Sequence, residues 1–202
     1  MFLLSIWDVC WLASSIATTS KPKPSVTCLF MVDLQSSGKD QAAIATYRTY
    51  FAFALLTASK LNDASDFTGY LDTFGYSDGF TDHDNYTVSN YYNFKSTPFP
   101  MSHTDDDIDL DLKDTDASLA HALWNPPTKD QTCLIFFSAA PEAEYGGTTI
   151  QPRYNSFTTV IGVRIGGATS IPGLTDSIDA SSMTDGDAQA IVTKLLESLP
   201  PT

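Results

Sequence analysis

Long uninterrupted apolar runs alternate with segments of helical periodicity along the 202 residues of this chain. Three runs rich in β-branched and aromatic residues predict strands covered on both faces: Val26–Val32, Thr132–Phe137 and Phe157–Ile165. Apolar residues at helical spacing predict a long helix at Asp40–Leu61 and a last helix at Thr184–Leu199 with a capping box. Weaker patterns predict two further strands, Phe67–Tyr76 and Asn85–Phe94, and two short helices, Ser118–Trp124 and Pro172–Ala180.

Strands that alternate with helices predict the α/β class. We expect a central, mainly parallel sheet with helices on both faces, which makes a three-layer α/β/α arrangement. In this interpretation residues 26–199 form one domain, and residues 21–25 form an extended linker because proline alternates with lysine there. Asp33 follows the first buried run, so we expect it at the carboxyl edge of a middle strand.

The first twenty residues are the candidate targeting segment. Their apolar stretch is too short and too interrupted to span a membrane as a helix. Residues 1–20 resemble a signal peptide, although Asp8 interrupts the apolar part and no basic residue precedes it. A signal peptide would make the protein extracellular, and the sequon at Asn85 would then be a glycosylation site. Without one, the protein would be cytoplasmic.

The chain is strongly acidic, with 24 Asp and Glu residues against 11 Lys and Arg residues and a formal net charge of -13. Clustered basic residues are what a phosphate backbone requires, so this composition argues against a nucleic-acid partner. Acidity favours solvated faces, or binding of a cation or of a basic partner.

The polar residues after the first strand are the main candidate site. In open α/β sheets ligands bind beyond the carboxyl ends of the strands, where Asp33, Ser36 and Ser37 would lie. Carboxylate and hydroxyl oxygens suit Mg²⁺ or Ca²⁺. The alternative is that Asp33 and Ser36 satisfy the free amides at the start of the following helix.

The succession of these segments resembles a von Willebrand factor type A domain. The resemblance covers residues 25–199 and rests on the order FMVDLQSSG, TGYLDTFGYS, ASLAHAL, CLIFFSA, TVIGVRI and GLTDSIDASS. In particular the chain is similar to the divergent copies found in secreted nematode proteins. The resemblance implies a Rossmann-like fold and an adhesion or protein-binding module.

That family carries a metal-ion-dependent adhesion site, with an Asp-x-Ser-x-Ser motif after the first strand. Asp33 and Ser37 match the Asp and the second Ser, whereas Gln35 stands where the first Ser belongs. The family's Thr position falls on Ala117, with Thr115 two residues earlier, and its second Asp position falls on Ala139.

These departures imply a degenerate site. One carboxylate would hold a hard cation poorly, so Mg²⁺ or Ca²⁺ is expected to bind weakly and no cofactor is expected. The resemblance then implies that Asp33 now serves the start of the helix. The partner, a protein or a glycan, would contact the rim formed by the loops after Asp33, before Ala117 and after Ser138.

The acidic connector Thr104–Asp116 is a second candidate for a cation. Asp105, Asp107, Asp109 and Asp116 follow EF-hand spacing, but Leu110 occupies the position that requires glycine. Alternation of aspartates with apolar residues better fits a loop or edge segment with one buried side.

Neither a nucleophile elbow, a P-loop nor a dinucleotide fingerprint follows a predicted strand, so we do not expect an enzyme. The alternatives are an α/β hydrolase or nucleotide-binding enzyme with an unrecognised site on the same rim, and an intracellular scaffold of the same family.

Cys28 and Cys133 lie inside predicted strands. If Asp33 and Ala139 end neighbouring strands at one level, Cys28 lies beside Leu134 and the two thiols point to opposite faces. This register predicts no bond between them.

Overall fold

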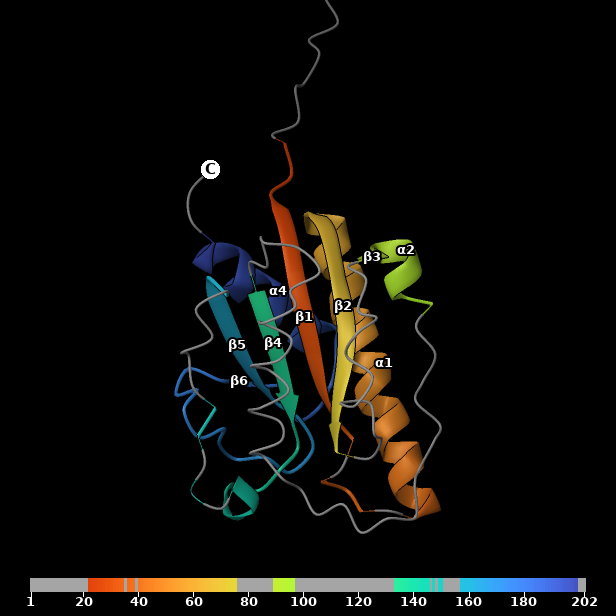
Figure 1. Cartoon of the computed structure of the whole chain (residues 1–202), viewed down its shortest axis with the longest axis vertical. Helices are drawn as coiled ribbons and strands as arrows, with labels where there is room; N and C mark the ends of the chain where they lie inside the picture. The colour runs from red at the N-terminus through yellow and green to blue at the C-terminus, as the bar shows by residue number, and fades with distance from the viewer. Residues whose placement is uncertain are drawn as a thin grey trace, which may run out of the picture.

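A computed structural model of the chain describes residues 22–34, 36–38, 40–75, 89–96, 133–145, 147, 149–150 and 157–199. A six-stranded sheet in the order β3-β2-β1-β4-β5-β6 forms its centre (Figure 1). The strands are β1 (Ser25–Leu34), β2 (Asp66–Gly75), β3 (Ser89–Asn90), β4 (Cys133–Ser138), β5 (Thr159–Arg164) and β6 (Ile178–Asp179). Five strands run parallel, and the short edge strand β3 runs antiparallel to β2.

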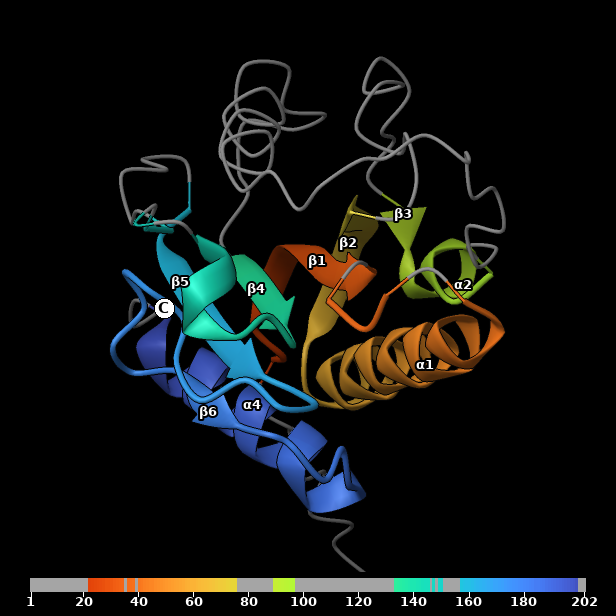
Figure 2. The same cartoon turned by 90° about the horizontal axis from the view of Figure 1, so that it is seen from below.

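Two helices pack on one face of the sheet, α1 (Gln41–Ala64) and α4 (Asp185–Ser198), as Figure 2 shows. Side chains of β1 and β4 alternate between this helix-covered face and the opposite face. The opposite face packs against the 3-10 helix η3 (Glu142–Tyr145) and against apolar residues of the connecting segments, among them Ile150, Ile171 and Leu174. The fold is therefore the predicted α/β class in a three-layer, Rossmann-like arrangement.

Burial on both faces explains the uninterrupted apolar runs. Every described residue of β4 is buried, and β1 is buried from Cys28 onward. Asp33 lies near the carboxyl end of β1, an interior strand, which confirms the predicted position. Thr184 caps α4 through the predicted capping box with Asp187.

Two predicted elements are wrong. Pro172–Ala180 is not a helix, because Gly173 adopts a positive φ of 91° and turns join Leu174 to Ile171 and Ser177 to Leu174 before β6. The predicted strand Asn85–Phe94 keeps only β3 among its described residues. The side chain of Asn90 caps the short helix α2 (Tyr91–Phe94) by accepting a hydrogen bond from the Asn93 amide.

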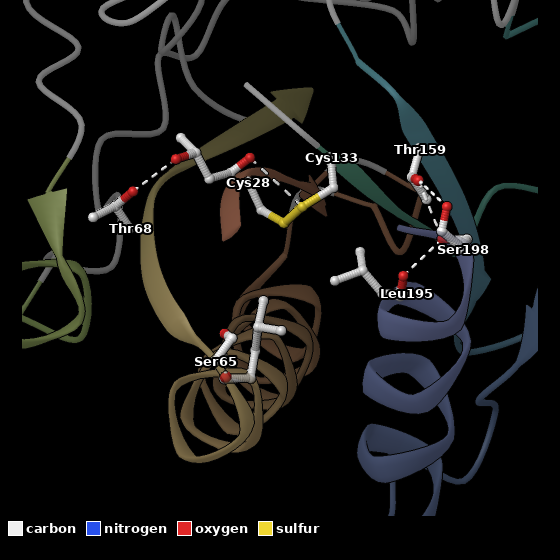
Figure 3. The surroundings of a disulfide bond; sticks show 9 residues. Cys28, Ser65, Thr68, Cys133, Thr159, Leu195 and Ser198 are labelled. Atoms are coloured by element: carbon white, nitrogen blue, oxygen red, sulfur yellow. Dashed lines mark hydrogen bonds between the residues drawn. A yellow bond between two sulfur atoms is a disulfide. The ribbon is translucent and has the colours of Figure 1, made fainter. Parts of the chain in front are cut away.

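The prediction of two separate thiols is also wrong. Cys28 is paired with Cys133 rather than with Leu134, their Cα atoms lie 4.5 Å apart, and their sulfur atoms form a disulfide (Figure 3). The predicted register of β1 against β4 differs by one residue from the register of the structure. Such a shift turns every side chain of a strand to the other face. Both cysteines therefore belong to the core cluster on the helix-covered face.

Candidate functional site

Asp33 is fully buried, with 0% of its surface exposed. One carboxylate oxygen accepts a hydrogen bond from the Ser36 amide at 3.0 Å. The other oxygen accepts from the Ser36 hydroxyl and from the Ala139 amide at 2.9 Å. Ala139 is the position where the resemblance implies a second metal-binding aspartate, and here its backbone N–H binds the carboxylate. Asp33 thus ties the loop after β1 to the chain leaving β4.

Asp33 does not serve the start of α1, so that part of the interpretation is wrong. The N-cap is Asp40, whose side chain accepts a hydrogen bond from the Ala43 amide at 2.8 Å. The helix begins at Gln41, and the Asp33 carboxylate accepts its hydrogen bonds from Ser36 and Ala139 instead.

Two tyrosines of α1 hold the intervening loop. The Tyr47 hydroxyl accepts a hydrogen bond from the Ser37 amide at 2.9 Å and donates to the Gly38 carbonyl at 2.8 Å. The Ser37 hydroxyl lies 3.3 Å from the Tyr50 hydroxyl. Burial raises the pKa of Tyr50 above its ordinary value, against an opposing effect of Ser37, and the Asp33 charge raises it further. Ser37 is therefore engaged by α1, not by Asp33.

A buried pair of hydroxyls lies at the end of β4. The hydroxyls of Ser138 and Tyr145 are 2.6 Å apart, and the Ala140 amide donates to the Ser138 oxygen at 3.2 Å. Burial is the main reason that the pKa of Tyr145 is raised far above its ordinary value. The pKa of Glu144 is also raised, first by partial burial and then by the charge of Asp33. Because its pKa is raised, the Tyr145 phenol stays protonated at neutral pH.

The strand register aligns four polar residues across the carboxyl rim. Asp33 and Ser138 lie one position past the last paired residues of β1 and β4, Ser138 is paired with Arg164 of β5, and Arg164 with Asp179 of β6. Paired residues of parallel strands present their side chains to the same face, here the face opposite α1 and α4. The pKa of Asp179 is lowered by hydrogen bonds from Ser181 and, to a lesser extent, by the Arg164 guanidinium.

Of the predicted rim residues, Asp33 and Ser36 are joined by hydrogen bonds, whereas Ser37 contacts Tyr50 and Ser138 contacts Tyr145. Gln35, Thr115 and the sequon residue Asn85 lie outside the described residues, as do Ala117 and the acidic connector. Among the residues that the structure describes, no group of three or more His, Cys, Asp or Glu side chains is placed to hold a metal ion. No helix in the same ranges is long and apolar enough to cross a membrane.

Sequence reasoning missed the tyrosines that hold the rim and the role of Arg164. The helical spacing within Asp40–Leu61 accounts for the buried ring of Tyr47 but not for the hydrogen bonds of its hydroxyl. Arg164 carried a visible signal, because it is the single charged residue in the run Phe157–Ile165. A charge within a strand covered on both faces requires a reason.

No protein-family model matches the chain, and no curated protein sequence matches it.

Proposed function

We propose that the protein is a non-catalytic, extracellular binding module whose carboxyl rim contacts a protein or glycan partner without a metal ion. The observation that carries this proposal is the state of Asp33. Its carboxylate is completely buried and accepts hydrogen bonds from two amides and a hydroxyl. These bonds join the loop after β1 to the segment after β4. A carboxylate that binds a hard cation would have to give up such bonds.

The remaining rim chemistry supports binding rather than catalysis. The Ser138 hydroxyl would need a neighbouring base to act as a nucleophile. Its described hydroxyl partner is Tyr145, and the raised pKa of this phenol makes it a poor base at neutral pH. The pair is better suited to fixing the chain after β4.

The disulfide supports the extracellular assignment. Disulfides persist in secreted proteins and are rare in the reducing cytosol. Cys28 and Cys133 have no exposed surface, so this bond holds two interior strands together and is not placed for exchange with an external thiol.

Thermal melting with Mg²⁺, Mn²⁺ or Ca²⁺ tests the metal-independent part. A metal that binds only the folded state at a hundredfold excess over its Kd would add about 2.7 kcal/mol to the free energy of unfolding. We expect millimolar concentrations of each ion to leave Tm of the wild type unchanged relative to EDTA. A rise of several degrees that disappears in Asp33→Ala would show a working metal site and overturn the proposal.

Binding at the rim is tested on glycan arrays and immobilised extracellular proteins in the presence of EDTA. Ser37→Arg places a bulky cation on the exposed loop after β1, and Thr193→Arg makes the matched change on the exposed side of α4. Any ligand of the wild type should be lost by the first variant and kept by the second. Equal binding by both variants would remove this part of the rim from the interface.

A further inference from the structure

The Arg164 guanidinium forms no ion pair with any residue that the structure describes. Its side chain is half-buried at the carboxyl end of β5, and Nη1 donates a hydrogen bond to the Thr169 carbonyl at 3.0 Å. Among the described residues no carboxylate lies within ion-pair distance of it, and its buried Nε has no hydrogen-bond partner there. Partial burial without full compensation costs free energy, and such a cost is retained where a group has a further task.

A cavity of about 380 Å³ adjoins this guanidinium. Its volume lies in the lower part of the range of small-ligand sites, roughly 300–1,000 Å³. Hydroxyls dominate the polar part of the lining, which includes Thr169, Ser170, Thr175 and Ser177 besides Arg164. Glu142 also lines it, and its carboxylate accepts a hydrogen bond from the Ser170 hydroxyl at 2.7 Å.

The walls of the cavity are fixed by main-chain contacts. The Ile150 amide donates to the Pro172 carbonyl at 2.8 Å, which ties the segment after η3 to the outer wall. At Gly173 the backbone passes so close to Ile150 that a Cβ would overlap the Ile150 carbonyl oxygen. Leu174, which lines the cavity, packs against β5, where a Cβ on Gly162 would lie 3.1 Å from the Leu174 side chain. Contacts within the fold thus hold these lining residues in place.

We propose that this cavity binds a single carboxylate group through Arg164. Guanidinium donors match the two oxygens of a carboxylate in a planar, bidentate arrangement. The inference rests on the proposed function and specifies the partner: a protein that presents an acidic side chain or a chain terminus to the rim. The hydroxyls of the lining are suited to bind polar atoms next to that group.

The surrounding charges select a monoanion over a phosphate. Glu142 lines the cavity and Asp179 is paired with Arg164 across the sheet. Each of these carboxylates repels an incoming anion, and the repulsion of a phosphate that carries nearly two charges is correspondingly larger. A monoanion is therefore repelled less than a phosphate by these two carboxylates.

Titration of the ¹⁵N-labelled full chain with acetate tests the site. The readout is the Nε–H signal of Arg164 in proton–nitrogen spectra, at an ionic strength held constant with chloride because screening alone moves such signals. We expect a saturable shift with acetate and a weaker response to inorganic phosphate. An amide-capped peptide with one glutamate, and its glutamine counterpart with a free C-terminus, distinguish side-chain from terminal carboxylates.

Variants make the assignment specific. Arg164→Lys should weaken acetate binding by about tenfold, since it keeps the charge and loses the planar pair of donors. Arg164→Gln should abolish saturation, and Arg48→Gln, which removes the same charge from an exposed position of α1, should bind as the wild type does.

A shift that stays linear in the wild type, tighter binding of phosphate than of acetate, or saturation retained in Arg164→Gln would each overturn the proposal. If neither Arg164 variant folds, the wild-type titration decides alone. If acetate does not bind and melting is independent of metal ions, only the carboxylate site is refuted. If melting depends on a metal ion, the proposed function itself is refuted.

Discussion

Replacement of Asp33 by alanine should destabilise the fold more than replacement of Asp40 by alanine. The two aspartates flank the same loop, between β1 and α1. Asp33→Ala leaves the buried Ala139 amide without its acceptor, which costs about 1–3 kcal/mol. The Ser36 donors are half-exposed, and water replaces part of their bonds, so they add about 1 kcal/mol. Removing the charge recovers some desolvation free energy.

The net loss in the free energy of unfolding is therefore about 2–4 kcal/mol for Asp33→Ala. Asp40 is an exposed N-cap, and its replacement by alanine should cost about 1 kcal/mol. Asp33→Asn keeps the size of the side chain but turns one acceptor into a donor, so its loss should fall near that of alanine.

Equilibrium unfolding in urea measures these differences, with the slope of each transition compared to establish that the denatured states match. A domain of ordinary stability, about 5–15 kcal/mol, would remain folded with either substitution. The reasoning fails if Asp33→Ala costs less than Asp40→Ala, because the hydrogen bonds from Ser36 and Ala139 to Asp33 would then contribute nothing beyond solvation.

Three further outcomes follow from the fold. Thiol counting under denaturing, non-reducing conditions should find Cys28 and Cys133 joined, and because they lie 105 residues apart, replacing both by serine should cost up to about 4.7 kcal/mol in urea. Gly147→Ala should lower the free energy of unfolding by about 1–2 kcal/mol, and Gly173→Ala should lower it by more. Both glycines have positive φ, but of the two only Gly173 faces a backbone carbonyl that a Cβ would overlap, so equal Tm values would contradict this. Glu144→Gln should raise stability at pH 7 by less than about 0.5 kcal/mol. Because the folded-state pKa of Glu144 is raised, its cost is present above that pKa and is lost as pH falls, so a gain that grows in acid would refute this.

The sequence predicted the class of the fold because the physical requirement is local. A strand covered on both faces must be apolar throughout, and β1, β4 and β5 are visible as such. The elements it missed depend on single contacts. The segment Pro172–Ala180 has helical spacing, but Gly173 is placed against the segment at Ile150, a tertiary contact that no periodicity records.

The location of the candidate site could be predicted from the sequence, but the hydrogen-bond partners of its residues could not. Asp33, Ser36, Ser37 and Ser138 do lie at or just after the carboxyl ends of β1 and β4, which share one edge of the parallel sheet. Which donors reach Asp33 could not be predicted, because the Ala139 amide lies just after β4, 106 positions later in the chain. A backbone donor leaves no mark in a sequence, whereas a metal-binding aspartate at the same position would.

The register of β1 against β4 decides which side chains lie next to one another at the carboxyl rim. The positions of Cys28 and Cys133 indicate that register. Cys28 precedes Asp33 by five positions, and Cys133 precedes Ser138 by five. If the two cysteines are accepted as partners, Asp33 and Ser138 must be level and on one face, since side chains alternate along each strand. The pairing of Ser138 with Arg164 then extends the row to β5. The resemblance implies that Ala139 is level with Asp33. In that register Ser138 would be one residue out of line with Asp33, so the row of polar residues is not predicted. The disulfide therefore does more than join two strands: it fixes the alignment in which a buried acid, a hydroxyl and a guanidinium share one edge of the sheet.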